Sequence, residues 1–455
     1  MSTAVDTAFL STRVVAGGVV QPAAVLVKDG RIIDVVAPTA RPRDCDVIDV
    51  LDAVLLPGLV DTHVHVNEPG RTAWEGFATA TRAAALGGIT TIVDMPLNSL
   101  PPTTSVAAFE EKLAAASGQL AIDVGFWGGL VPGNTSSLAP LVERGVLGFK
   151  CFLIDSGVPE FKNVERGDLE RGLGTLRDAG VPLLAHAELP GPIDDAAAAA
   201  AALDVKSYRH HLVGRPKAAE DLAVALLIEL CRAHRARVHV VHHCSSSSLA
   251  AIEAARHSGL PFSAETCPHY LSFAAEDIHD GATHFKCTPP IRERDNREAL
   301  WGALCSGVLD AVVSDHSPCT AALKRMDLGD FDRAWGGISG LQLSLPATWT
   351  GARAHGASLV DLARWMSERP AALAGLANKG AIAKGKDADL VAFDPDATIT
   401  VDQSLLAHKN PLTPYHGRTL YGAVRATWLR GRLVTSRGSD LTSRDGRLLL
   451  KGRTA

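Results

Sequence analysis

Two histidines separated by one residue, His63 and His65, follow an apolar run at residues 53–60. In a β-strand, residues i and i+2 point to the same face, so both imidazoles would leave a buried strand in one direction. Neutral imidazole is the commonest metal ligand in proteins. The pair therefore predicts half of a metal site, unless it is simply two surface histidines at a strand end.

Four further polar side chains stand where other apolar segments end: Lys150, His186, His242 and Asp315. Catalytic residues of parallel α/β barrels come from the carboxyl ends of the strands. Together with the histidine pair, these side chains would converge at one end of such a barrel. His243 directly follows His242 and could take its place, because strand alternation does not decide between the two.

Lys150 is unusual because its neighbours Phe149, Cys151 and Phe152 are apolar. Burial disfavours an ammonium ion and lowers the pKa of a lysine from about 10.4. One interpretation is an ion pair with Asp315. The other is a neutral amine that captures carbon dioxide, giving a carbamate whose two oxygens can bridge two metals about 3.5–4 Å apart.

The middle of the chain must position these side chains, and it alternates strand and helix patterns. Strands are expected at residues 54–66, 89–95, 120–131, 145–153, 181–188, 236–244, 260–271 and 308–315. Helices are expected between most of them, as at residues 73–86, 106–116, 169–179, 217–235 and 247–257. This alternation predicts an α/β fold, a (β/α)8 TIM barrel. A doubly wound sheet is the alternative, but the Gly-x-Gly-x-x-Gly fingerprint is missing.

Both ends of the chain are rich in short strands and turns. We expect them to pair into a small β-sandwich domain built from residues 1–55 and 381–455, with the hydrolase barrel at residues 56–380. The alanine-rich run at residues 196–202 predicts a surface helix or loop, and residues 194–215 could instead be a mobile cover over the site.

Composition excludes several classes of protein. The net charge of −5 gives no electrostatic reason to expect nucleic acid or a membrane as partner. There is no apolar run of about 18 residues and no secretory signal pattern. The 8 scattered cysteines are typical of reduced, buried thiols, so we expect a cytoplasmic protein.

The chain resembles the cyclic amidohydrolases of the amidohydrolase superfamily along essentially its whole length. The motifs that carry the resemblance are residues 57–65, Gly148-Phe149-Lys150, His186-Ala187-Glu188, His242, Ser314-Asp315-His316 and residues 380–391. At the sixth strand, Cys244 stands where the family usually has serine.

The resemblance implies two divalent cations, most simply Zn²⁺, with Co²⁺, Fe²⁺ or Mn²⁺ also possible. His63, His65 and Asp315 would hold one metal, and His186 and His242 the other. N6-carboxylated Lys150 and a hydroxide would bridge them. Asp315 would also move the proton, first as a general base and then as a general acid.

Other motifs resemble the allantoinase subfamily, which implies hydrolysis of the cyclic amide of allantoin to allantoate in purine and ureide catabolism. Related dihydroorotases carry an arginine two residues after the second histidine, to pair with the substrate carboxylate; here that residue is Asn67. The expected substrate-binding residues are Asn67, Arg71, Asn98, Thr288, Ser317 and Ser339. Thr288 stands where serine is expected.

Two alternatives remain open at this point. One is a hydantoinase or dihydropyrimidinase acting on another cyclic ureide. The other is a non-catalytic scaffold of the same fold, which the filled ligand positions disfavour. The resemblance also suggests a homo-oligomer, with a tetramer as the expected form.

Overall fold

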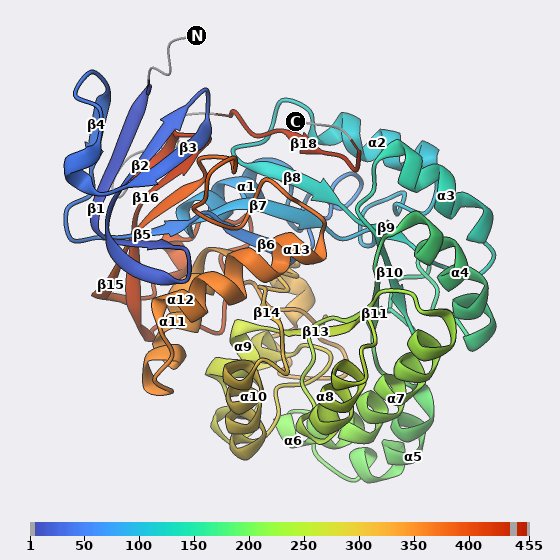
Figure 1. The fold of residues 1–455 in the computed structure, drawn as a ribbon. Coiled ribbons are helices and arrows are strands. Elements are labelled where there is room, and N and C mark those ends of the chain that lie inside the picture. The colour runs from blue at the N-terminus through green and yellow to red at the C-terminus, as the bar shows by residue number, and fades with distance from the viewer. Residues whose placement is uncertain (1–4, 437–443, 453–455) are drawn as a thin grey trace.

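Parallel strands surrounded by helices form the larger part of the computed structural model, which describes residues 5–436 and 444–452 (Figure 1). The parallel strands are β6 (Leu59–Val64), β7 (Ile89–Asp94), β8 (Asp123–Phe126), β9 (Gly128–Gly129), β10 (Phe149–Phe152), β11 (Leu183–His186), β12 (Val238–Val240), β13 (Phe262–Thr266) and β14 (Ala311–Val312). Strands β6, β7 and β8 are neighbours in one sheet, and β9 to β14 follow in chain order in another.

Backbone contacts connect these two sheets at both edges. Val64 of β6 forms a parallel bridge with His316, just beyond β14. At the other edge, the Leu147 amide donates to the Phe126 carbonyl oxygen over 2.9 Å. The strand ends that carry the predicted ligands therefore lie around a common centre.

Helices cover the outside of these strands because their apolar residues recur with helical spacing. Their bounds are α1 (Phe77–Leu86), α2 (Val106–Ala116), α3 (Thr135–Arg144), α4 (Arg166–Ala179), α5 (Pro190–Ala201), α6 (Tyr208–Gly214), α7 (Lys217–His234), α8 (Leu249–His257), α9 (Pro268–Ser272), α10 (Arg294–Ser306), α11 (Ser344–Ala354), α12 (Leu359–Ala363) and α13 (Arg369–Leu373). In α4, for example, Leu169, Leu173 and Leu176 are buried on one face.

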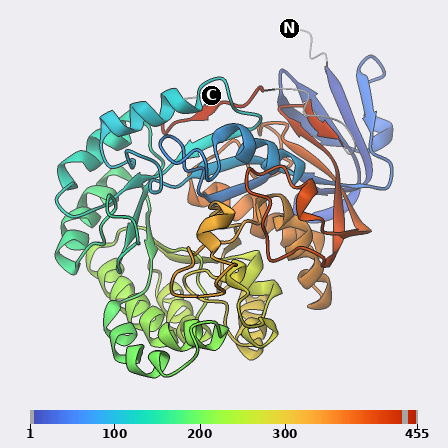
Figure 2. The ribbon, with the colours of Figure 1, turned by 180° about the vertical axis from the view of Figure 1, so that it is seen from behind.

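Strands from both ends of the chain form a second, smaller unit. They are β1 (Thr7–Ala16), β2 (Val19–Lys28), β3 (Arg31–Val36), β4 (Asp46–Asp49), β5 (Val54–Pro57), β15 (Leu390–Thr400), β16 (Thr419–Leu429) and β17 (Arg432–Ser436). The order is β17-β16-β15-β5-β1-β2-β3, with β4 beside β1, so the two ends meet where β5 pairs with β15. Figure 2 shows these first and last strands side by side.

The apolar segment at residues 54–66 was expected to be one strand, and this is wrong. It divides at Gly58 into β5, which pairs with β15 of the small sheet, and β6, which pairs with β7. The Gly58 amide donates to the Asp389 carbonyl oxygen, and a Cβ on Gly58 would lie 2.2 Å from Thr90 Oγ1. Only glycine allows the chain to pass between the two sheets so closely.

The strand expected at residues 120–131 is also divided, into β8 and β9. In addition, the last described segment leaves the small sheet: β18 (Leu448–Leu449) pairs in parallel with β8. The alanine-rich run lies largely within α5, whose residues are mostly exposed.

A buried ion cluster joins the two units. Lys379 Nζ lies 2.6 Å from both Asp123 Oδ2 and Asp389 Oδ2, and 3.0 Å from Asp387 Oδ2. Asp123 belongs to β8 of the larger unit, and Asp389 directly precedes β15 of the small sheet. One ammonium ion thus neutralises carboxylates from both.

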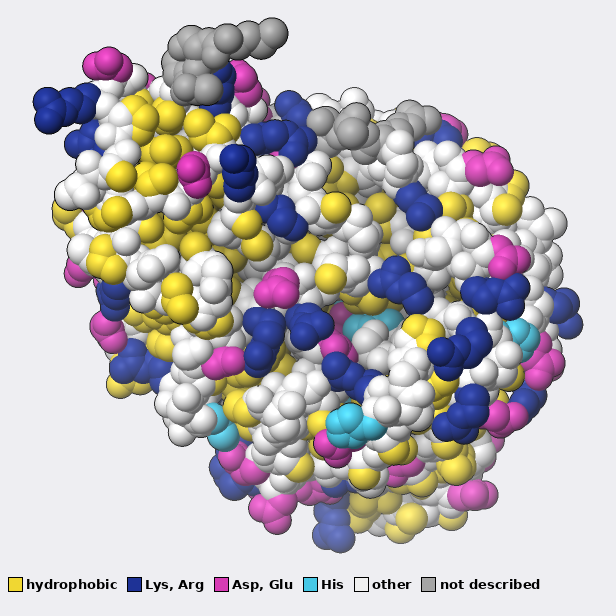
Figure 3. All heavy atoms as spheres, viewed as in Figure 1, with side chains coloured by type: hydrophobic (Ala, Val, Ile, Leu, Met, Phe, Trp, Pro, Cys, Tyr) yellow, Lys and Arg dark blue, Asp and Glu magenta, His cyan; other side chains and the backbone are white. Residues whose placement is uncertain are grey.

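On the surface, Figure 3 shows acidic and basic side chains interspersed over the larger unit, and apolar side chains gathered over the small sheet. None of the described helices combines the length and apolar character that a membrane span requires.

Candidate active site

The histidine pair and the aspartate expected to share a metal lie together in the structure. His63 Nε2 is 3.2 Å, and His65 Nε2 3.6 Å, from the same oxygen, Oδ1 of Asp315. All three side chains are buried. Burial alone would raise the pKa of the Asp315 carboxyl, but the facing imidazoles hold it well below its usual range, so the group is an anion at neutral pH.

A second pair of histidines completes the opposite side of the centre. His186 at the end of β11 places Nδ1 3.0 Å from Nε2 of His242. Burial lowers the pKa of both imidazoles, so both are neutral and available as ligands. The neighbouring His243 points elsewhere, since its Nε2 lies 2.7 Å from the Ser245 carbonyl oxygen. The geometry thus places His242, and not His243, at the centre.

Lys150 belongs to strand β10 and is close enough to both groups for its charge to lower the pKa of His63, His186 and His242. Its Nζ is buried and has no hydrogen-bond partner among the described residues. Desolvation lowers the pKa of the amine to about 8, although Asp315 and Glu265 oppose that shift. A buried amine with this pKa has a substantial neutral, nucleophilic fraction near physiological pH, as carbamate formation requires.

Two of the expected ligands have strained backbones. His242 (φ 38°) and Asp315 (φ 44°) adopt left-handed conformations although neither is glycine. Such conformations cost of order 1–3 kcal/mol each and persist where the surroundings hold them in place. Asp61 contributes to that hold, because its carboxylate accepts hydrogen bonds from the His63 and Ser314 amides at 3.1 and 3.0 Å.

The donor set fits a divalent cation, since His63, His65 and Asp315 each offer a ligand atom within 4.8 Å of the others. Three buried nitrogen atoms, His63 Nε2, His242 Nδ1 and Lys150 Nζ, lack any hydrogen-bond partner among the described residues. Unpaired buried polar atoms are costly, and all three residues line one cavity, which indicates that a ligand binds there. Imidazole and carboxylate donors suit zinc and its neighbours in the first transition series.

A second layer of groups orients the ligands. His63 Nδ1 lies 2.7 Å from Glu265 Oε1, whose other oxygen is 3.0 Å from His239 Nε2. His239 in turn contacts Ser263 Oγ at 2.7 Å. A carboxylate on the second ring nitrogen fixes the tautomer of a histidine ligand and raises its basicity.

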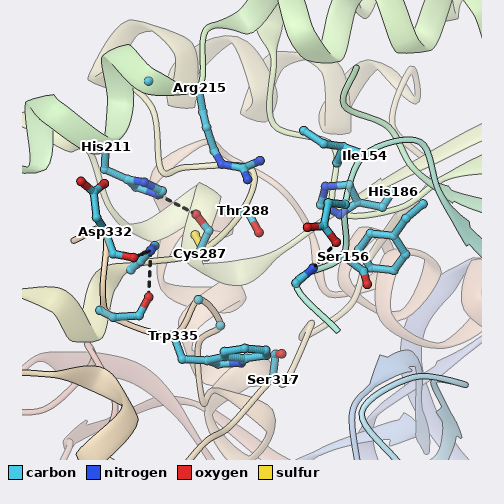
Figure 4. Close-up of a pocket in the computed structure, with 18 of the residues that line it drawn as sticks. Ile154, Ser156, His186, His211, Arg215, Cys287, Thr288, Ser317, Asp332 and Trp335 are labelled. Carbon is cyan, nitrogen blue, oxygen red and sulfur yellow. Dashed lines mark hydrogen bonds between the residues drawn. The ribbon is translucent and has the colours of Figure 1, made fainter. Parts of the chain in front are cut away.

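The centre opens into a cavity of about 890 Å³ (Figure 4). Of the substrate-binding residues predicted from the sequence, Asn98, Thr288 and Ser317 line this cavity. Asn98 also places its Nδ2 3.3 Å from His65 Nδ1. Ala197, Ala200 and Ala201 of α5 line the cavity as well, so the alanine-rich run forms part of its wall.

The other three predicted contacts lie outside the described lining. Asn67 donates to the Pro318 carbonyl oxygen at 3.4 Å. Arg71 donates to the Asn98 carbonyl oxygen at 3.0 Å, and Ser339 accepts from Thr413 Oγ1 through its own carbonyl oxygen. In this structure the side chains of Asn67 and Arg71 and the backbone of Ser339 bind to neighbouring loops.

Sequence reasoning missed Glu265, His239 and Arg215, and assigned no role to Glu188. The signal for Glu265 was available, because an acidic residue at the end of an apolar strand needs a partner when it is buried. Arg215 gave no such signal, since it lies between two helices and is brought to the cavity only by their packing.

The parallel strands, with helices outside them, carry buried histidines around an ionised aspartate at their ends. This arrangement is that of a metal-dependent hydrolase. The amidohydrolase family model matches residues 54–434, and the chain belongs to this family.

Near relatives and solved structures agree with this assignment. The chain is 52% identical, over 98% of both chains, to a protein named allantoinase from Streptomyces avermitilis. It is 44% identical to an allantoinase from Saccharomyces cerevisiae, over 98% of this chain and 99% of the other. It also resembles the structure of an L-hydantoinase (dihydropyrimidinase) from Arthrobacter aurescens, with a TM-score of 0.94 and 30% identity over 98% and 100% of the two chains.

Proposed function

We propose that the protein is an allantoinase, which hydrolyses the five-membered ring of allantoin to open-chain allantoate. The observation that carries this proposal is the 52% identity to an allantoinase over nearly the whole of both chains. The reaction adds water across one ring amide bond: the carbonyl carbon gains a hydroxyl group and becomes a carboxylate, and the ring nitrogen gains a proton.

We propose two divalent cations, with Zn²⁺ as the simplest choice and Co²⁺, Fe²⁺ or Mn²⁺ as alternatives. His63, His65 and Asp315 would hold one cation, and His186 and His242 the other. Lys150, carboxylated by carbon dioxide, would contribute to both. Such cations lower the pKa of water to about 7 and polarise a carbonyl oxygen.

The protein's own groups then have separate tasks. The Asp315 carboxylate accepts the proton of water and returns it to the leaving ring nitrogen, because it is ionised and lies at the centre. Asn98, Thr288 and Ser317 line the space beside it, where they can donate to or accept from the ureide groups of the ring. Ala197, Ala200 and Ala201 of α5 add an apolar side to the same cavity.

The residue two positions after His65 suits an uncharged substrate. Asn67 there carries no charge, and its Nδ2 donates to the Pro318 carbonyl oxygen over 3.4 Å. A dihydroorotate carboxylate would therefore lack a cationic partner at that position. A hydantoinase activity is the second candidate, favoured by the TM-score of 0.94 to an L-hydantoinase.

Several finer features belong to the same proposal. We propose that strands β6 to β14, with β8 and β9 counted as one, close into a (β/α)8 barrel, supported by the bridge between Val64 and His316. We also propose that the small unit is a β-sandwich. The domain limits at residues 55 and 380, the homotetramer and the cytoplasmic location are further expectations. Light scattering after size-exclusion chromatography tests the tetramer.

The decisive experiment assays one purified preparation on allantoin, hydantoin, dihydrouracil and dihydroorotate, with elemental analysis of the same sample. Allantoin should give the highest kcat/KM, with about two metal ions per subunit. Preference for hydantoin or dihydrouracil would replace the proposal by the second candidate. Efficient hydrolysis of dihydroorotate would overturn the argument from Asn67.

A further inference from the structure

Arg215 places a guanidinium group in the cavity wall, opposite Trp335 (Figure 4). It comes directly after α6 and is followed by Pro216, which precedes α7. Its carbonyl oxygen accepts a hydrogen bond of 3.0 Å from Arg292 Nη1, and Arg292 is itself buried and paired with Glu220. The backbone that carries this guanidinium is therefore held firmly.

Only part of the guanidinium is engaged within the protein. Nη1 lies 2.7 Å from Glu188 Oε2, whereas Nε and Nη2 have no hydrogen-bond partner among the described residues. The side chain is 25% exposed, and Arg215 is one of the residues that line the cavity. Arginine presents its donors in a rigid plane, so two donors remain free for a ligand beside the one bound to Glu188.

The other cations of the cavity lining are less well placed for this task. Lys286 Nζ donates to the Ala334 carbonyl oxygen at 2.8 Å and lies 3.4 Å from that of Asp332. The Arg333 side chain is 70% exposed and lies 3.5 Å from Asp330. Arg215 is thus the guanidinium that faces the interior with unused donors.

Allantoin differs from hydantoin by a ureido substituent, whose carbonyl oxygen needs donors once it leaves water. We propose that Arg215 determines specificity by donating from Nε and Nη2 to this ureido carbonyl oxygen. This inference rests on the proposed function and adds the residue that distinguishes allantoin from the bare ring. The ring of Trp335 lines the same cavity.

The same residue links the substituent to the metal centre. Glu188, which holds Arg215, also lies 2.8 Å from His186 Nε2, leaving Nδ1 of that ring for the centre. Burial would raise the pKa of Glu188, but Arg215 and His186 lower it to about 2, so the carboxylate is ionised. Arg215 consequently serves two roles, and a test must separate them.

The test is the Arg215→Lys variant, assayed on allantoin and hydantoin in one preparation whose metal content is measured. Lysine keeps a positive charge beside Glu188 but loses the planar pair of donors. Any loss of metal or of His186 orientation lowers both rates together and cancels in their ratio. Arg209→Lys, at an exposed position of α6, the helix that precedes Arg215, is the matched control.

We expect the allantoin-to-hydantoin ratio of kcat/KM to fall by about tenfold to a hundredfold in Arg215→Lys, as for the loss of a charged hydrogen bond. Arg209→Lys should leave it unchanged. An unchanged ratio in Arg215→Lys, with a wild-type enzyme active on allantoin, overturns the inference alone. A wild-type enzyme inactive on allantoin instead overturns the proposed function. If Arg215→Lys folds poorly, Arg215→Gln, which keeps an amide donor, should give an intermediate ratio.

Discussion

Glu265 Oε1 lies 2.7 Å from the Nδ1 atom of His63, and both groups are fully buried. Burial would raise the pKa of Glu265, but His239 and His63 lower it to about 2, so the carboxylate is charged at any working pH. It therefore fixes which nitrogen of His63 faces the metal centre.

Replacing Glu265 by Gln should weaken metal binding by about tenfold to a hundredfold, the usual effect of losing a carboxylate behind a histidine ligand. Competition with a chelator, followed by elemental analysis, measures this directly. Glu253→Gln, at an exposed position of α8, is a control. Wild-type affinity in Glu265→Gln would show that the tautomer of His63 is set by other groups.

Lys150→Ala should lose most bound metal and reduce kcat by orders of magnitude, since the buried amine is the only source of the proposed carbamate. Elemental analysis and an allantoin assay measure both effects. Short carboxylic acids added to this variant should restore part of the activity if a bridging carboxylate is what the site lacks. Full metal content and activity without them would refute carboxylation of Lys150.

The stability of the protein should decrease as the pH falls below about 6.5, in part because of His211. Burial lowers the pKa of this imidazole to about 3, and its Nε2 donates to the Cys287 carbonyl oxygen at 2.9 Å. The unfolded chain takes up a proton below about pH 6.5 while the folded protein does not. The contribution of His211 to the free energy of unfolding is therefore fully present above about pH 6.5 and is lost progressively towards pH 3.

Urea unfolding at pH 6.5 and 4.5 tests the sign of this effect. One such group contributes about 2 kcal/mol to the difference between the two pH values. His211→Gln keeps a donor for Cys287 but cannot be protonated, so its pH dependence should be flatter by that amount. His257→Gln, at an exposed position, should follow the wild type. Parallel curves for His211→Gln and wild type would contradict the assignment.

The Gly337→Ala substitution should distort the wall of the cavity while leaving the predicted metal ligands in place. Gly337 has a φ of 121°, and a Cβ there would lie 2.2 Å from the Ser317 carbonyl oxygen. Both residues line the cavity, so the loop must move away. We expect KM for allantoin to rise at least severalfold with metal content unchanged; Gly356→Ala, at a positive φ with open space around it, separates backbone strain from the clash.

Lys379→Met should destabilise the fold by about 3 kcal/mol or more, because it leaves buried carboxylates without their counter-ion. Three aspartates, Asp123, Asp387 and Asp389, approach its amine. Denaturant unfolding against the exposed Lys384→Met control measures the loss. A stability equal to that of the control would mean that Arg430, which also contacts Asp123, neutralises the cluster alone.

The positions of the ligands along the strands could be predicted from the sequence because each is a polar residue at the end of an apolar run. His63, His65, His186, His242 and Asp315 all meet at one centre in the structure. The choice of His242 over His243 depended on resemblance, since the φ of 38° at His242 breaks the alternation on which strand reasoning relies.

The substrate side of the site could not be predicted in the same way. Asn67, Arg71 and Ser339 were chosen by motif, yet their hydrogen bonds hold loops. Arg215 reaches the cavity through the packing of α6 against its neighbours, a long-range property that local pattern does not contain. The division of residues 54–66 at Gly58 was missed for a similar reason, because its cause, Asp389, lies far along the chain.

The pairing of β5 with β15 also has a consequence for the order in which the protein can fold during synthesis. Leu56 of β5 pairs with Val391 of β15. The edge of β5 that faces β15 therefore stays unpaired until more than three hundred further residues have been made. The strands of the larger unit, in contrast, find partners close by in the chain. We expect the ribosome-bound chain to complete those strands first and to expose the apolar edge of β5 meanwhile, which makes that edge a natural binding site for chaperones.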